Sequence, residues 1–179
     1  MKITLKKIFG HFATITKHRH MVILHSKKAG ILWQGLLHDL SKYSPSEFWV
    51  GARYFSGDRS PNEAERHIYG YSTAWLHHKG RNKHHFEYWS DYDTTTHELK
   101  PVKMPEKYIA EMFCDRVAAS KIYQGKNYTN NHPIEYFMRA KGIRPIHPET
   151  SNIIEDLLRT LAEHGEDTAF SKIRKMLNK

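Results

Sequence analysis

Histidine stands out among the residue types of this chain that can do chemistry. Fourteen histidines recur between His11 and His164, inside otherwise ordinary sequence, in a chain of 179 residues. Imidazole is the commonest metal ligand in proteins and the side chain that titrates nearest neutrality. The placement of these histidines beside carboxylates therefore decides whether they can bind a metal.

A His-Asp pair, His38 and Asp39, lies in a leucine-rich run that we expect to form a buried helix. An unpaired buried carboxylate is costly, so Asp39 requires a cation, hydrogen-bond donors or a metal. Neighbouring positions on a helix lie about 100° apart, which lets both side chains converge on one ion. The alternative is that Asp39 accepts hydrogen bonds from a helix N-terminus and that His38 is an ordinary core residue.

The first predicted helix, residues 3–28, adds a histidine to this set. His18 lies on the apolar stripe of that helix, so it points inward. His25 follows one heptad later on the same stripe and is the reserve candidate, whereas His20 is turned by some 200° from His18 and should face solvent. The alternative for either inward residue is a histidine hydrogen-bonded inside a packed face.

A second acid, Asp115, lies among apolar and small residues of a strongly helical segment. Its spacing from the apolar positions of that helix puts it on or beside the core face. The alternative is a local ion pair with Arg116 or Arg139. The adjacent Cys114 is a soft ligand type, but a free buried thiol is more typical of plain core.

Two histidine pairs, His77-His78 and His84-His85, bracket a short and very basic turn. Four histidines among three cations would be unusual for a solvated loop, which is the alternative. Crowding depresses histidine protonation and leaves the neutral imidazole that binds metals. The cations of the turn offer charge for a nearby phosphate. They are Lys79, Arg81 and Lys83.

Helical patterns dominate the elements that must position these residues. Apolar residues recur at three-and-four spacing over residues 3–28, and Gly30 suits a C-terminal cap. Two Ser-Pro-x-Glu sequences, beginning at Ser44 and Ser60, fit capping boxes and predict helices that end near Gly57 and Gly80. The stripe of the first helix consists of Leu5, Ile8, Phe12, Ile15 and Val22.

The second half of the chain predicts one long loop and four more helices. Residues 81–104 are polar, aromatic and turn-prone, and a loop of this length is usually functional or disordered. Its aromatic residues argue against disorder. We find no alternating strand pattern, so we expect an all-α, single-domain helical bundle over residues 1–179. The four helices are expected at residues 105–124, 132–141, 149–164 and 167–178.

The overall composition indicates the cellular compartment of the protein and the charge of its partner. A formal charge of +9 and a pI near 9.5 favour an anionic partner, which includes nucleic acid, although the basic residues are spread widely. No stretch approaches the ~18–20 unbroken apolar residues of a membrane span, and polar residues interrupt any export signal. One cysteine excludes an internal disulfide, so we expect a cytoplasmic protein. Oligomeric state is open.

Taken in order, the histidines and acids resemble the signature of the HD superfamily of metal-dependent phosphohydrolases. That signature is a histidine on one helix, a His-Asp pair on a later helix and a distant aspartate. The matching positions are His18, then His38 with Asp39, then Asp115. The resemblance extends to Lys42, because His-Asp-x-x-Lys is a common form of the pair, with the lysine near substrate phosphate.

The resemblance also bears on the remaining histidines and on most of the chain. Members with two metals insert further histidines before the last aspartate. More closely, residues 5–160 resemble a family of uncharacterised bacterial and phage proteins that has no established activity. Four stretches carry this resemblance: Lys17-His18-Arg19, GLLHDLSKYSPSEF from Gly35, GYSTAWLHHKGRNKHHFEYW from Gly70 and EMFCDRVAAS from Glu111. The histidines that would serve a second metal are His77, His78, His84 and His85.

The HD resemblance implies hydrolysis of a nucleotide or another small phosphorylated molecule. One or two metal ions would activate a water molecule, Asp39 would orient it or take its proton, and Lys42 and Arg81 would neutralise phosphate charge. Nitrogen and carboxylate ligands suit Mn, Fe, Co, Ni or catalytic Zn. One alternative is a non-catalytic protein that binds nucleic acid or a nucleotide and keeps a structural metal or histidine cluster. Another is a di-iron oxygenase, an activity that some HD-like proteins have.

Overall fold

The computed structural model describes residues 2–178, and helices account for most of them. The predicted all-α class is confirmed, apart from one two-stranded antiparallel hairpin in which Ser90 pairs with Pro101. The α-helices are α1 Leu5–Ala29, α2 Leu32–Leu37, α3 Pro45–Tyr54, α4 Pro61–Tyr69, α5 Thr73–Lys79, α6 Glu106–Gln124, α7 His132–Met138 and α8 Pro148–Leu177. The shorter elements are the 3-10 helices η1 Leu40–Tyr43, η2 Phe86–Tyr88 and η3 Gly125–Asn127 and the strands β1 Ser90–Tyr92 and β2 Leu99–Pro101.

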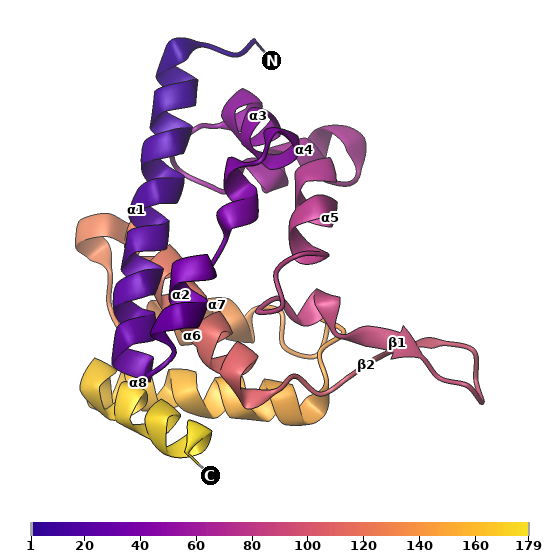
Figure 1. The fold of residues 1–179 in the computed structure, drawn as a ribbon, viewed down its shortest axis with the longest axis vertical. Coiled ribbons are helices and arrows are strands. Elements are labelled where there is room, and N and C mark those ends of the chain that lie inside the picture. The colour runs from indigo at the N-terminus through magenta and orange to yellow at the C-terminus, as the bar shows by residue number, and fades with distance from the viewer. Residues whose placement is uncertain (1, 179) are drawn as a thin grey trace.

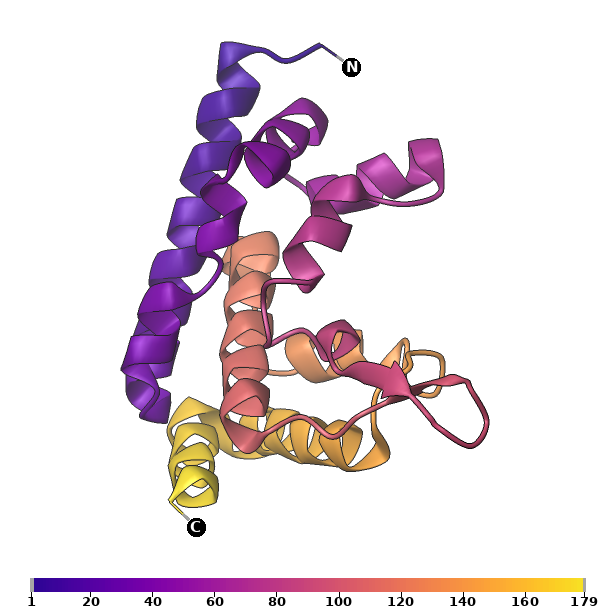
Figure 2. The same cartoon turned by 45° about the vertical axis from the view of Figure 1, so that its right-hand side comes forward.

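Helix α6 forms the centre of the hydrophobic core. It runs beside α1, while α8 crosses the lower ends of both helices (Figures 1 and 2). Phe113 of α6 meets Phe170 of α8 edge to face, with ring centroids 5.8 Å apart. The helices α3, α4 and α5 lie toward the N-terminal end of α1, beyond this core (Figure 1). No helix among residues 2–178 combines the length and the apolar character needed to cross a bilayer.

The first helix agrees with its predicted limits, but only part of its apolar stripe is buried. The side chain of Thr4 accepts a hydrogen bond from the backbone N–H of Lys7, and Gly30 ends the helix in the left-handed conformation. Leu5 and Phe12 are 72% and 48% exposed, which corrects the expectation that they join the core. The reason is that the N-terminal part of α1 extends past α6 (Figure 1).

The leucine-rich run after α1 does not form a buried helix. Helix α2 spans six residues, and Trp33 and Leu37 on it are 81% and 69% exposed. Gly35 is the buried residue of this helix, and its backbone rests against Ser26 of α1. The run is apolar, but this backbone contact turns its large side chains away from the core.

Substitution of Gly35 by alanine tests the close contact between α1 and α2. A Cβ atom at this position would lie 2.4 Å from Cβ of Ser26, so one helix must shift. We expect the free energy of unfolding to fall by about 1–3 kcal/mol, measured from urea midpoints at constant m-value. Gly80→Ala is the control, because its nearest atom would be 3.5 Å away. Equal midpoints for the wild type and Gly35→Ala would contradict the contact.

The predicted helix that was to end near Gly80 is two helices. Gly70 adopts φ 79°, which ends α4, and the side chain of Ser72 accepts a hydrogen bond from Trp75 to begin α5. The first Ser-Pro-x-Glu helix also ends earlier than expected, at Tyr54. Neither predicted capping serine makes the side-chain bond of a capping box. The serines mark the helix starts, but the glutamate of the first sequence has other partners.

The stretch predicted as a loop, residues 81–104, contains η2 and the hairpin, which projects away from the helices (Figure 1). Phe86 is buried and Trp89 packs on the core, which explains why the stretch is ordered despite its polarity. Near the C-terminus, Gly165 breaks α8 at φ 80° and ψ 177°, at the position where the sequence predicted a stop between two helices.

Candidate metal centre

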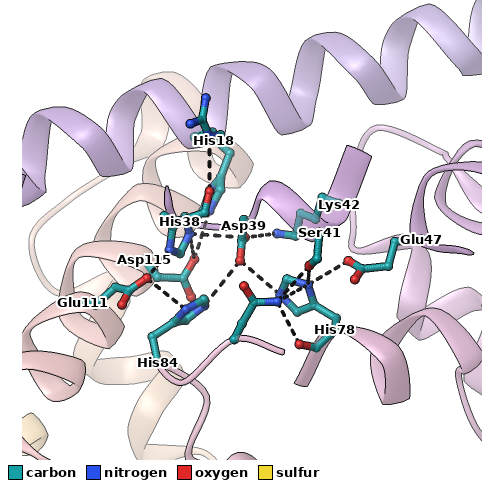
Figure 3. A network of polar contacts seen from close by, with 12 residues as sticks. His18, His38, Asp39, Ser41, Lys42, Glu47, His78, His84, Glu111 and Asp115 are labelled. Atoms are coloured by element: carbon teal, nitrogen blue, oxygen red, sulfur yellow. Dashed lines mark hydrogen bonds and ion pairs between the residues drawn. The ribbon is translucent and has the colours of Figure 1, made fainter. Parts of the chain in front are cut away.

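Seven of the side chains proposed as metal ligands meet in one place, although they come from different segments of the chain. Figure 3 labels all of them except His85. Three of these ligands lie on helices, His38 directly follows a helix, and the other three lie in turns. Burial is nearly complete for most of the set, so the cluster is an internal feature. Its members are His18 of α1, His38 and Asp39 between α2 and η1, His78 of α5, His84 and His85 of the following loop, and Asp115 of α6.

The His-Asp pair lies in a sharp turn instead of a helix. Helix α2 ends at Leu37, His38 is extended, and Asp39 adopts φ 54° and ψ 25°. Aspartate tolerates this left-handed conformation better than most residues, although the conformation still costs energy. Backbone strain of this kind concentrates at functional sites, where the surrounding structure holds it in place. The turn, and not a 100° step on a helix, brings both side chains into the cluster.

One group of potential ligands surrounds one oxygen of Asp39. Nε2 of His38 lies 3.2 Å from Asp39 Oδ2 and 3.6 Å from Asp115 Oδ1. Nε2 of His18 lies 2.9 Å from the same Asp115 oxygen. One ligand atom from each of these four residues falls within 4.8 Å of the others, a spacing that one metal ion can bridge. Asp115 is paired with histidine here and not with an arginine.

A second group of potential ligands surrounds the other oxygen of Asp39. Nε2 of His78 lies 3.2 Å from Asp39 Oδ1, and Nε2 of His84 lies 3.6 Å from it. His85 completes this group, again within 4.8 Å. Asp39 therefore lies between two sets of imidazoles and presents one oxygen to each. This arrangement can hold two ions with a bridging carboxylate.

The opposite ring nitrogens of the histidines face carboxylates that the sequence analysis did not assign to the site. Nδ1 of His38 and Nδ1 of His84 lie 2.8 and 3.2 Å from Oε1 of Glu111. Nδ1 of His78 lies 2.8 Å from Oε2 of Glu47. A carboxylate can only accept a hydrogen bond, so these nitrogens carry the proton and Nε2 is left with a free lone pair when the ring is neutral. Metal-binding histidines have this second-shell arrangement.

The position of Glu111 at the site could have been predicted from its helical spacing, whereas the sequence around Glu47 indicated a capping residue. Glu111 precedes Asp115 by four residues, so both lie on one face of α6. Glu47 fitted a capping box, and only the packing of α3 against α5 turns its carboxylate to His77 and His78. The missing capping bond at Ser44 agrees with this other use of Glu47.

Several inward-facing atoms of the cluster have no hydrogen-bond partner of good geometry. Both carboxylate oxygens of Asp39 and the Nε2 atoms of four histidines are buried without a well-oriented partner, although charged groups lie close to them. An orphaned buried polar atom is costly, and orphaned atoms that converge are what a metal ion would satisfy. The donor set therefore fits a transition-metal ion. The four histidines are His18, His38, His84 and His85.

The charges of the cluster shift the pKa values of its members in opposite directions. Burial alone would raise the pKa of Asp39, but the charges of His38, Lys42 and His78 hold it well below its usual range. Burial opposes protonation of His38, yet the Asp39 charge, the close contacts with Asp115 and Asp39 and the hydrogen bond to Glu111 raise its pKa well above the ordinary value. A metal ion would replace the protons that these carboxylates attract.

The expectation that crowding keeps the loop histidines neutral holds for one residue and fails for another. Burial and the neighbouring His84 and His78 lower the pKa of His85 well below its ordinary value. Burial also acts on His78, but the carboxylates of Asp39 and Glu47 raise its pKa above that value. Carboxylates in contact thus outweigh crowding at His78.

Three other candidates lie apart from the cluster. His77 contacts Glu47 and Ser46 on the outer side of α3, and it belongs to neither group around Asp39. Arg81 is exposed and donates to the carbonyl oxygen of His77. His25 contacts the backbone oxygen of Cys114 and the ammonium of Lys121, so the structure brings His18, and not His25, to the cluster. The Cys114 thiol is buried core, as predicted.

A large cavity of about 720 Å³ lies against the cluster. Lys42 also lines it and places its ammonium nitrogen 2.6 Å from Oδ2 of Asp39. Small-molecule sites in proteins typically occupy about 300–1,000 Å³, so this volume suits a nucleotide-sized compound. The cluster residues that reach the cavity are His18, His78, His85 and Asp115.

Substitution of Glu111 by glutamine tests the second-shell arrangement. The amide would no longer accept strong hydrogen bonds from both His38 and His84, so their rings would lose orientation and basicity. We expect metal affinity to fall about 10–100-fold, measured by competition with a chromophoric chelator. Glu106→Gln, an exposed position at the start of the same helix, serves as the control. An affinity equal to that of the control would show that Glu111 does not support the ligands.

Fold and site together define a helical protein with a buried cluster of histidines and carboxylates beside a large cavity. Residues 7–160 match the model of a family described as a family of unknown function (DUF5662), and the chain belongs to this family. Searches among curated proteins and among solved structures found no match. The expected membership in a family without an established activity is thus confirmed over nearly the predicted extent.

Proposed function

We propose that the cluster binds one or two divalent metal ions and that the protein is an HD-like, metal-dependent phosphohydrolase. The main support for metal binding is the position of Asp39, whose two oxygens face two sets of imidazoles. The order of the ligands along the chain, with a histidine, a His-Asp pair and a distant aspartate, supports the HD assignment. Nitrogen and oxygen donors without a thiolate favour Mn, Fe, Co, Ni or catalytic Zn.

Hydrolysis is the use of the metal that the surroundings of the cluster favour. A divalent ion held there would lower the pKa of a bound water molecule toward neutrality and polarise a phosphoryl oxygen. Asp39 presents one oxygen to each ligand group, so it would help to hold the ions and would orient the attacking water. Lys42 carries a positive charge to the cavity wall, where it would stabilise charge that develops on a phosphate.

A nucleotide or another small phosphorylated molecule is the proposed substrate class. The cavity volume suits a compound of this size, and several cationic side chains line the cavity beside the cluster. Arg81, which the sequence analysis placed near the phosphate, does not line the cavity. The proposal therefore assigns the phosphate contact to Lys42.

The test is phosphate release by protein of known metal content. The protein is stripped with a chelator, reloaded separately with Mn, Fe, Co, Ni or Zn, and assayed with nucleoside mono-, di- and triphosphates and small phosphomonoesters. We expect turnover with at least one ion and none after stripping. Stoichiometric metal without phosphate release from any compound would overturn the hydrolase proposal. Oxygen consumption by the iron form, with an oxidation-sensitive optical band, would assign the site to an oxygenase instead.

A further inference from the structure

The cavity contains a second group of charges that the proposed reaction does not use. Arg116 of α6 and Arg144, in the segment between α7 and α8, both line the cavity beside the metal centre, and Arg139 lines it as well. Arg116 directly follows Asp115, so this group begins next to a proposed metal ligand. These cations therefore line the same cavity as the proposed reaction.

Neither Arg116 nor Arg144 has an anionic partner among residues 2–178. No carboxylate of that part of the chain lies within 4.0 Å of either guanidinium. Nε of Arg116 is buried without a hydrogen-bond partner, and the same side chain makes only a 3.9 Å contact with the sulfur of Met112. A buried guanidinium nitrogen normally has its donor satisfied, because an unmet donor is costly. The two arginines thus line the cavity without an anionic partner from residues 2–178.

Two aromatic residues of α7 hold these guanidinium groups by their faces. Cζ of Arg116 lies 5.6 Å from the ring centroid of Phe137, and Cζ of Arg144 lies 5.3 Å from that of Tyr136. A guanidinium over a ring keeps N–H groups free for a planar or multidentate acceptor. The aromatic contacts therefore hold both arginines at the cavity without using their hydrogen-bond donors.

The two guanidinium groups lie against neighbouring residues of α7, Phe137 and Tyr136, and both line the same cavity. Asp115 is engaged by His18, and Glu87 makes no ion pair within 4.0 Å with any residue from 2 to 178. Like charges in a partly buried space repel, so an anion between them would be stabilising.

We infer that Arg116 and Arg144 form an anion subsite that binds a second phosphate group of the substrate. The inference rests on the proposed function and narrows its substrate class to compounds with at least two phosphate groups, such as nucleoside di- and triphosphates. One phosphate would lie at the histidine-aspartate cluster and another between the two guanidinium groups. A phosphate suits this position because its several oxygens can accept hydrogen bonds from both guanidinium groups at once.

Tripolyphosphate binding to metal-stripped protein tests the subsite separately from the metal. Calorimetry at low ionic strength would compare the wild type with Arg144→Gln and with Arg159→Gln, which loses the same charge from an exposed ion pair on α8. We expect Arg144→Gln to weaken binding at least about 10-fold, the loss of one charged hydrogen-bonding partner, and Arg159→Gln to leave it nearly unchanged. Equal affinities, or equal losses in both variants, would overturn the subsite.

Arg116→Lys is a second variant that keeps the buried charge if Arg116 is needed for folding. A lysine retains one cation but cannot offer the guanidinium edge, so tripolyphosphate binding should again weaken. Wild-type affinity in a folded Arg116→Lys protein would also contradict the inference. Circular dichroism establishes that both variants fold.

Kinetics of the metal-loaded protein separate this inference from the proposed function. If hydrolysis occurs, Arg144→Gln should raise KM for a nucleoside triphosphate about 10-fold and leave KM for the monophosphate unchanged. An equal rise for both compounds would contradict the subsite and leave hydrolysis standing. If no compound is hydrolysed but Arg144→Gln still binds tripolyphosphate more weakly than the wild type, the subsite stands and the hydrolase proposal fails.

Discussion

Asp39→Asn is expected to remove metal from the protein almost completely. The substitution keeps the size of the side chain and its tolerance of the left-handed backbone, but it removes the charge that two sets of imidazoles share. Second-shell changes already cost about 10–100-fold in metal affinity, so the loss of a bridging ligand should exceed about 100-fold. Metal analysis after dialysis against limiting metal measures the effect.

Thermal unfolding provides a second readout for Asp39→Asn. An ion at 1,000 times its Kd stabilises the folded protein by about 4 kcal/mol, which for a chain of this size raises Tm by about 8–16 °C. We expect this rise in the wild type and none in Asp39→Asn. The control is Asp93→Asn, in the exposed tip of the hairpin, which should bind metal normally. Normal metal content in Asp39→Asn would remove the basis of the proposed centre.

Lys42→Met is expected to abolish most of the phosphohydrolase activity and leave the metal in place. Methionine keeps an unbranched apolar stem and removes the ammonium that lies 2.6 Å from Asp39 and reaches the cavity. Loss of one group that stabilises charge in the transition state typically lowers kcat about 10²–10³-fold. Steady-state rates with the best substrate, together with metal analysis, measure both expectations.

Lys42→Met is informative because we expect metal affinity and kcat to respond differently to it. In the metal-free protein the ammonium of Lys42 neutralises Asp39, so its removal takes away a competitor for the ion. Metal affinity should therefore stay constant or rise while kcat falls. Lys126→Met, at an exposed position of η3, is the control for charge loss. A variant that loses both metal and activity would show that Lys42 supports the ligands and does not serve the substrate.

Several features of the site could be predicted because they depend on short-range pattern. The inward position of His18 follows from helical periodicity, and His20 faces solvent for the same reason. Asp115 lies beside the core face of α6, and Glu111, one turn earlier, shares that face. A helix places side chains by spacing alone, so a sequence is sufficient for these residues.

Features that depend on contacts between distant segments could not be predicted. A leucine-rich run suggested a buried helix, but the contact between Gly35 and Ser26 turns its side chains outward. Glu47 has the spacing of a capping residue, yet the approach of α5 supplies it with His78 as a partner. Local sequence patterns cannot predict these contacts, because the groups that stabilise them are distant in the chain.

The sequence by itself determined the helical class, the start of nearly every helix and the residue types available for a metal. Tertiary structure decided which residues meet, through the packing of the helices and a backbone turn at Asp39. A left-handed aspartate has no periodic signature, and the side chain of Asp39 contacts residues that are distant in the chain, such as His78 of α5. The convergence of the cluster is thus a property of packing, while its chemistry is a property of the residues.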